Sequence, residues 1–129
     1  MKALVVAESA AARSVLRDAL RKAAFQVLEA EGPDDAMELL ADLGPFELGL
    51  IDGEAGGGLA LARRVRAEPD FASVRLMMVI PELQVERMLE ALKAGVDGYL
   101  IKPFSLPTLL AKLADLGLRR QGKKGKRTR

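Results

Sequence analysis

Three runs of apolar residues in this chain each end at a charged side chain. The three charged residues are Glu8 after residues 4–7, Asp52 after residues 48–51, and Lys102 after residues 99–101. If the runs are parallel strands of one sheet, two carboxylates and one ammonium group meet at the edge where the strands end. Carboxylates bind hard divalent cations, and a cation together with a lysine stabilises a phosphoryl group. The pattern therefore predicts a site for a divalent cation and a phosphoryl group, centred on Asp52.

A fourth apolar run, residues 76–79, ends at Ile80. An isoleucine side chain neither donates nor accepts a hydrogen bond. We therefore expect the fourth strand to bring no polar group to the site.

The segments that must position these residues alternate between strand-like and helix-like patterns five times. The predicted strands are residues 2–7, 25–30, 48–52, 75–80 and 98–101, and the predicted helices are residues 10–24, 33–43, 59–67, 83–94 and 106–116. Consecutive apolar residues indicate strands that are buried on both faces, and the helices have apolar positions at helical spacing. We expect Met77, Met78 and Met88 in the core, and Ser9 and Ser105 as helix N-caps. This alternation predicts an α/β fold, a flavodoxin-like (βα)5 three-layer sandwich with a parallel sheet of order 2-1-3-4-5.

The composition excludes several kinds of site. The chain of 129 residues is 50% hydrophobic, which is enough for one core, and it has no cysteine and no histidine. Disulfides, cysteine or histidine metal sites, and catalysis by a histidine base are therefore impossible. No apolar stretch approaches the roughly 18 residues of a membrane span, and residues 1–25 lack the features of a signal peptide. We expect a soluble, cytoplasmic domain without a membrane segment.

The basic residues are concentrated at the end of the chain. Residues 119–129 contain seven lysines and arginines and no acid, whereas the rest has 13 basic and 18 acidic residues. We therefore expect one folded domain over residues 1–117 and a basic tail over residues 118–129. The tail is interpreted as a solvated linker, as an arm that binds nucleic acid through phosphate contacts, or as a continuation of the last helix.

The ordered motifs resemble the CheY-like receiver domain of response regulators over about residues 1–117. The matching segments are Leu4-Val5-Val6 with Glu8, Arg13 with Leu16, Leu50-Ile51-Asp52, residues 94–100, and Lys102-Pro103-Phe104. The resemblance implies a signalling protein of two-component phosphorelays and not an enzyme. It implies a histidine kinase or phosphotransfer protein as phosphate donor, and a downstream protein that binds the face formed by residues 83–116.

The resemblance also implies roles for individual residues. Asp52 would be the phosphoacceptor, and Mg²⁺ would bind Asp52, Glu8 and the backbone carbonyl of Glu54. Lys102 would contact the phosphoryl group, with a cis peptide bond between Lys102 and Pro103. Tyr99 would move with the switch, and Ile80 stands at the position where the family has its switch Ser or Thr.

The chain departs from the family pattern at this site. Ala7 replaces one of two expected acids, Ile80 replaces the switch hydroxyl, and Pro81 follows where a small residue is usual. The loop of residues 53–58 has four glycines and is about two residues short. We expect weak Mg²⁺ binding for this reason, and two interpretations remain open: a phosphorylatable receiver, and a phosphorylation-independent pseudo-receiver that acts as an adaptor.

Each site residue also has a simpler interpretation. Asp52 and Lys102 could form a structural ion pair, and Glu8 could be an acid favoured at a helix start. Tyr99 could be a packing residue. Residues 56–58 could cradle the phosphate of a nucleotide, although the loop has no basic residue and Asp52 and Glu54 would repel phosphate.

Overall fold

The computed structural model describes residues 1–53, 57–82 and 84–118. Five strands form one parallel sheet of order β2-β1-β3-β4-β5. The strands are β1 (Lys2–Val6), β2 (Gln26–Ala30), β3 (Leu48–Asp52), β4 (Arg75–Ile80) and β5 (Gly98–Ile101). The predicted fold and strand order are therefore confirmed. Three parts of the chain lie outside the described residues: residues 54–56 of the glycine-rich loop, which include Glu54, residue 83, and residues 119–129 of the basic tail.

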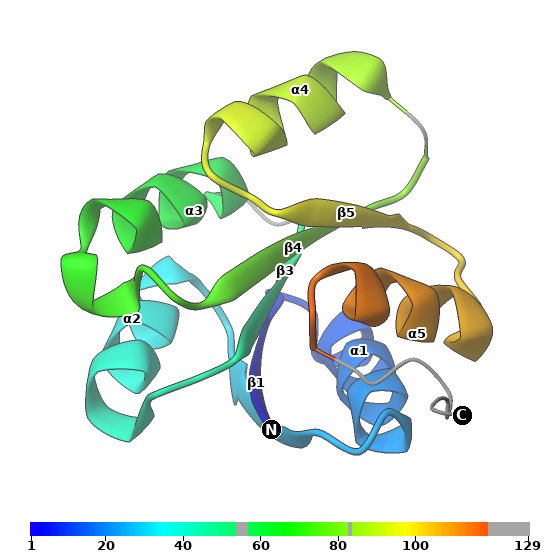
Figure 1. Cartoon of the computed structure of the whole chain (residues 1–129), viewed down its shortest axis with the longest axis horizontal. Coiled ribbons are helices and arrows are strands. Elements are labelled where there is room, and N and C mark those ends of the chain that lie inside the picture. Colours follow the sequence, from blue (N-terminus) through cyan, green and yellow to red (C-terminus); the bar gives the residue numbers. More distant parts are fainter. Residues whose placement is uncertain (54–56, 83, 119–129) are drawn as a thin grey trace, which may run out of the picture.

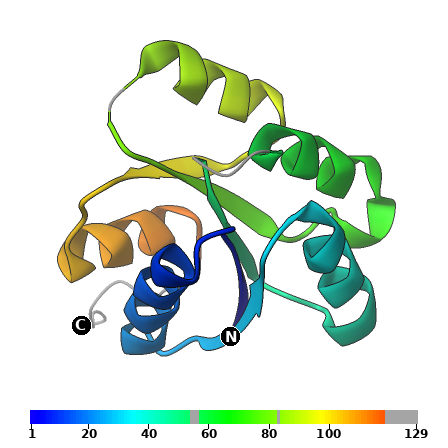
Figure 2. The ribbon, with the colours of Figure 1, turned by 180° about the vertical axis from the view of Figure 1, so that it is seen from behind.

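Five α-helices connect the strands and cover both faces of the sheet. They are α1 (Ala10–Lys22), α2 (Pro33–Leu43), α3 (Gly58–Ala67), α4 (Val85–Lys93) and α5 (Leu106–Asp115), and a short 3-10 helix, η1 (Pro69–Phe71), follows α3. Figure 1 shows α1 and α5 on one side of the sheet, α2 and α3 on the other, and α4 beside the edge strand β5. The view from behind in Figure 2 shows the same layers.

The helix ends follow local chemistry. The Ser9 and Ser105 side chains accept hydrogen bonds from the backbone N–H groups of Ala12 and Thr108, so both predicted N-caps are confirmed. The first helix ends at Lys22 and not at residue 24, because Ala24 has a φ of 69°, in the left-handed region.

Alternate residues of the central strands enter two separate cores. Leu76, Met78 and Ile80 of β4 pack on the side of α2, α3 and α4. Met77 and Val79 pack on the side of α1 and α5. This alternation sets the direction of Ile80, which faces the layer that contains α4.

The packing of α4 differs from the expectation for its apolar residues. Met77 and Met78 are buried as predicted, but Met88 is only partly buried at the margin of the core. The one buried residue within α4 is Ala91, while Val85, Leu89 and Leu92 are 63%, 52% and 47% exposed. The apolar side of the helix therefore points partly to solvent, because α4 contacts the core through Ala91 and the partly buried Met88.

Candidate functional site

Asp52 is the last residue of β3 and the one charged or polar side chain that is buried within the described residues, at 5% exposure. Its carboxylate Oδ1 lies 3.5 Å from the Nζ of Lys102. A buried carboxylate requires a charged or hydrogen-bonding partner, since its desolvation is costly. The 3.5 Å separation is long for a hydrogen bond, so the pair is held mainly by charge attraction.

The strand register brings Lys102 to this position. Asp52 pairs with Val79 of β4, and Ile80 pairs with Ile101 of β5. The backbone N–H of Lys102 then donates to the carbonyl of Ile80 at 2.8 Å. Residues that are 50 positions apart in sequence therefore meet at one edge of the sheet. The Lys102–Pro103 peptide bond is cis, as the family resemblance implies.

Glu8 follows β1 at the same edge, and its carboxylate is exposed beside the start of α2. The guanidinium of Arg13 donates to the carbonyls of Ala7 at 2.8 Å and Glu8 at 3.0 Å. Arg13 also lies 3.7 Å from the carboxylate of Glu29. Through these contacts with main-chain carbonyls, Arg13 stabilises the turn that contains Glu8.

The position of the expected second acid is apolar and closed. Ala7 is 0% exposed, and its N–H donates to the carbonyl of Ala30. No group of three or more carboxylates that could hold a metal ion lies within the described residues. Two carboxylates, Glu8 and Asp52, remain as described donors. They suit Mg²⁺, a hard cation that keeps several waters and is often bound through one or two carboxylates.

Ile80 is 2% exposed and packs against the main chain that follows Asp52. The N–H of Gly53 donates to the carbonyl of Val79 at 2.6 Å, which places Gly53 directly over β4. A Cβ added to Gly53 would lie 3.0 Å from Cγ2 of Ile80 and 2.7 Å from the Val79 carbonyl oxygen. The space next to Asp52 where the family has a hydroxyl is therefore filled by an aliphatic side chain.

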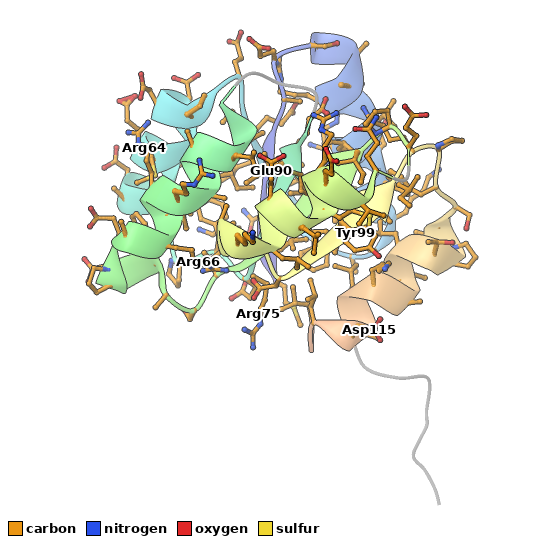
Figure 3. All side chains as sticks on the ribbon, turned by 90° about the horizontal axis from the view of Figure 1, so that it is seen from above. Arg64, Arg66, Arg75, Glu90, Tyr99 and Asp115 are labelled. Carbon is orange, nitrogen blue, oxygen red and sulfur yellow. The ribbon has the colours of Figure 1, made fainter. Side chains whose placement is uncertain are left out.

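Tyr99 is partly buried, and its contacts are with packing residues and a lysine. The Nζ of Lys112 on α5 lies 4.7 Å from the centre of the Tyr99 ring. A cation at this distance from an aromatic ring is attracted by the electron density of the ring face. Figure 3 shows Tyr99 between α4 and α5.

Arg87 is a site residue that the sequence patterns did not indicate. From α4 its Nη2 donates to the carbonyl of Gly53 at 2.7 Å. Arg87, Gly53, Met78 and Arg63 of α3 are among the residues that line a hollow of about 350 Å³ between α3 and α4. No local sequence pattern marks Arg87, because its contact with Gly53 depends on how α4 packs beside the end of β3.

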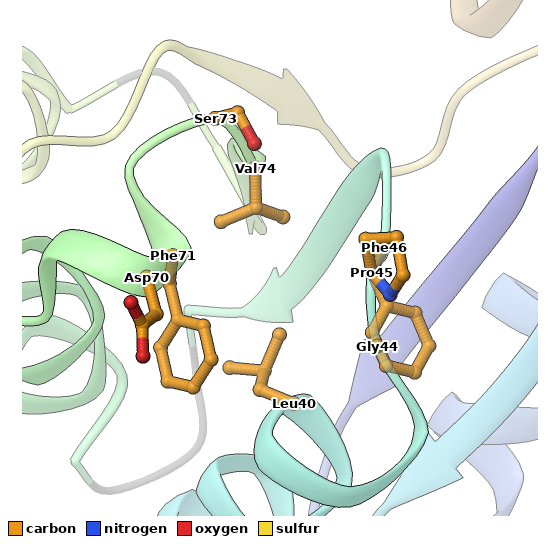
Figure 4. A pocket seen from close by; sticks show the side chains of 8 residues that line it. All are labelled: Leu40, Gly44, Pro45, Phe46, Asp70, Phe71, Ser73 and Val74. Atoms are coloured by element: carbon orange, nitrogen blue, oxygen red, sulfur yellow. The ribbon is translucent and has the colours of Figure 1, made fainter.

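A second hollow lies at the opposite end of the sheet and takes no part in this site. It has a volume of about 170 Å³, and Figure 4 shows its lining residues, Leu40, Gly44, Pro45, Phe46, Asp70, Phe71, Ser73 and Val74. Phe46 and Val74 precede β3 and β4, whereas Asp52 stands at the end of β3. This hollow is therefore separated from the hollow beside Gly53 by the length of strands β3 and β4.

Comparison with known proteins agrees with the fold and identifies the family. Residues 3–114 match the response regulator receiver domain, so the chain belongs to this family. It is 32% identical over 117 residues to chemotaxis protein CheY-3 of Vibrio cholerae, covering 88% of each chain. It is 34% identical over 119 residues to a chemotaxis protein CheY homolog of Campylobacter jejuni, covering 90% of this chain and 92% of that one.

A solved structure shows the same architecture. The chemotaxis response regulator CheY4 of Vibrio cholerae superimposes with a TM-score of 0.80 at 25% identity, covering 89% of this chain and 97% of that chain. The protein is thus a receiver domain of two-component signal transduction, in a family of signalling proteins that bind Mg²⁺ at an acidic pocket. Within the described residues no helix is long and apolar enough to cross a membrane.

Proposed function

We propose that Asp52 accepts a phosphoryl group from a histidine kinase or phosphotransfer protein. The observation that supports this most directly is the Asp52 carboxylate, buried at the end of β3 with the Lys102 ammonium group 3.5 Å away. A purely structural ion pair would have no need of a second carboxylate, Glu8, which follows β1 at the same edge of the sheet. The family match and the CheY relatives also support phosphorylation over the phosphorylation-independent adaptor.

Each residue of the site has a separate role in the proposed phosphoryl transfer. An oxygen of Asp52 attacks the phosphorus of a phosphohistidine, so that an O–P bond forms while the N–P bond breaks and the histidine nitrogen leaves with the electron pair. Lys102 stabilises an oxygen of the transferred group by charge. Asp52, Glu8 and the backbone carbonyl of Glu54, which lies outside the described residues, would hold Mg²⁺, and the ion would supply positive charge between the two anionic partners. With one acid fewer than usual, we propose weak Mg²⁺ binding.

We propose the face of residues 83–116 as the output surface, with the exposed α4 side chains Val85, Leu89 and Leu92 at its centre. Three large apolar side chains that are each about half exposed or more form a patch on one helix. Apolar patches of this kind mark sites of protein contact. Tyr99 and Lys112 lie on the same face, where Lys112 adds a positive charge.

Phosphorylation is tested by loading the protein with Mg²⁺ and beryllofluoride, an analogue of the phosphoryl group. A fluorine NMR signal for bound beryllofluoride is expected with the native protein and is expected to disappear in Asp52→Asn. Asp35→Asn is the matched control, because Asp35 is an exposed acid at the same end of the molecule. Acetyl phosphate provides the covalent test, in which intact mass increases by one phosphoryl group only when Asp52 is present. A native protein that binds no beryllofluoride at millimolar Mg²⁺ would contradict the proposal.

A further inference from the structure

Arg87 connects α4 directly to the peptide that follows Asp52. The Nη2 of Arg87 donates to the carbonyl of Gly53 at 2.7 Å, and the contact is partly buried and spans 34 positions in sequence. A hydrogen bond from a charged donor is shorter and roughly twice as strong as a neutral one. The bond therefore provides a specific mechanical connection between the site and α4.

Gly53 cannot move independently of Asp52 and β4. Its N–H donates to the Val79 carbonyl at 2.6 Å, and an added Cβ would lie 3.1 Å or less from Met78 and Ile80. Because it is also bonded covalently to Asp52, its carbonyl oxygen follows any displacement of the Asp52 main chain. Arg87 is thus attached to the peptide group that directly follows Asp52.

α4 has few other attachments that could resist such a displacement. Ala91 is its one buried residue, and its large apolar residues Val85, Leu89 and Leu92 are exposed. Within the described part of the chain, none of the ion pairs involves a residue of α4. Within the described residues, the side-chain hydrogen bond that joins α4 to another segment of the chain is the one from Arg87 to the Gly53 carbonyl. Elements with little buried apolar area belong to the least stable parts of a fold and move most easily.

We infer that Arg87 is a positioning residue that couples the occupancy of Asp52 to the position of α4, by way of the Gly53 carbonyl. This coupling replaces a route through residue 80, since Ile80 has no hydroxyl to move toward a phosphoryl group. The inference rests on the proposed phosphorylation of Asp52. It predicts that the exposed patch on α4 changes its position or mobility when Asp52 is loaded.

The test compares Arg87→Met, Arg87→Lys and Arg63→Met with the native protein. Methionine keeps the aliphatic stem but removes the donor, while lysine keeps a charged donor. Arg63 lines the same hollow but has no hydrogen bond or ion pair within the described residues, so Arg63→Met is the matched control. Fluorine NMR reports loading by beryllofluoride, and the amide signals of Gly53 and residues 85–93 report the response.

In the native protein and in Arg63→Met, loading is expected to shift the amides of Gly53 and α4. In Arg87→Met, the fluorine signal of bound beryllofluoride persists while the α4 shifts are lost, and Arg87→Lys recovers part of them. An α4 response in loaded Arg87→Met equal to that of the native protein would overturn the inference. A lost fluorine signal in Arg87→Met, with the signal retained in Arg63→Met, would also overturn it, because Arg87 would then act on loading itself.

Failure of the proposed function has a different signature. If the native protein takes up no beryllofluoride, the phosphoacceptor role of Asp52 fails, and the connection is then tested in the unloaded protein. Hydrogen exchange of the α4 amides is expected to be about tenfold faster in Arg87→Met than in the native protein and in Arg63→Met, because a charge-assisted bond is lost. Equal exchange rates in the three proteins would overturn the connection.

Discussion

The Cγ2 of Ile80 lies 3.0 Å from the point where a Cβ on Gly53 would stand. The Ile80 side chain at the end of β4 therefore fills the space that a side chain at position 53 would need. Close packing makes such a pair sensitive to added volume at either position. The result is an aliphatic contact beside the proposed phosphoacceptor, at the place where the family has a polar switch residue.

Gly53→Ala is expected to lower the free energy of unfolding by about 1–3 kcal/mol, since the added methyl group overpacks the site. The methyl group would lie 2.7 Å from the carbonyl oxygen of Val79, and a main-chain atom yields less easily than a flexible side chain. Urea denaturation measures the effect. Gly32→Ala is the control, because nothing lies within 4 Å of its added Cβ. A difference between the two variants of less than about 0.5 kcal/mol would contradict the packing argument.

Ile80→Thr is expected to add a hydroxyl contact on loading, at a cost in stability. Burying a hydroxyl in this apolar environment is expected to cost about 1–3 kcal/mol in the unloaded protein. Beryllofluoride on Asp52 would give the hydroxyl an acceptor, so the increase of Tm on loading is predicted to exceed that of the native protein. Ile80→Val, which loses one methylene, is expected to cost about 0.5–1.5 kcal/mol and to show no extra increase. Equal Tm increases in the threonine and valine variants would argue against this role for position 80.

Arg66→Met is expected to lower the free energy of unfolding by about 1–3 kcal/mol, since several hydrogen bonds of a partly buried group are lost. On α3, the Arg66 guanidinium donates to Asp97 at 2.7 Å and to the Gly95 carbonyl at 2.8 Å. The same Asp97 oxygen accepts the N–H of Leu76 at 2.8 Å. The cluster thus joins α3 to β4 and to the turn before β5.

Arg64→Met provides the comparison for Arg66, since both arginines lie on α3 and are labelled in Figure 3. Arg64 also makes a short ion pair, 2.9 Å to Asp34, but the Asp34 side chain is 92% exposed. Exposed ion pairs contribute about 0–1 kcal/mol, because water screens them. Thermal and urea unfolding should therefore rank Arg66→Met well below Arg64→Met in stability, and the reverse ranking would contradict the assignment.

Replacing the exposed α4 side chains with serine is expected to change the surface more than the stability. For Val85→Ser with Leu89→Ser, we expect a change in the free energy of unfolding of about 1 kcal/mol or less. Binding of a dye that reports apolar surface should fall. Ala91→Leu is the contrasting variant on the same helix, because Ala91 is 2% exposed and overpacking there is expected to cost about 1–3 kcal/mol. A large loss of stability in the serine variant would mean that these side chains support the core.

The sequence alone was sufficient for the fold and for placing Asp52 beside Lys102 at one edge of the sheet. Buried parallel strands leave consecutive apolar runs, and the charged residue that ends each run must stand at one edge of the sheet. Asp52, Lys102 and Glu8 can therefore be assigned to one end of the molecule from the sequence. The capping residues Ser9 and Ser105 were predictable for the same reason, since their hydrogen bonds are local in sequence.

The tertiary structure decided the contacts between segments that no local pattern specifies. Helical periodicity identified the apolar residues of α4, but how deeply the helix sits on the sheet determined that Leu89 is exposed and Ala91 buried. In the same way, Gly53 and Ile80 share one space, and Arg87 reaches the Gly53 carbonyl, only because β3, β4 and α4 meet there. Periodicity is a property of one element, whereas depth, direction and long-range hydrogen bonds depend on how elements pack together.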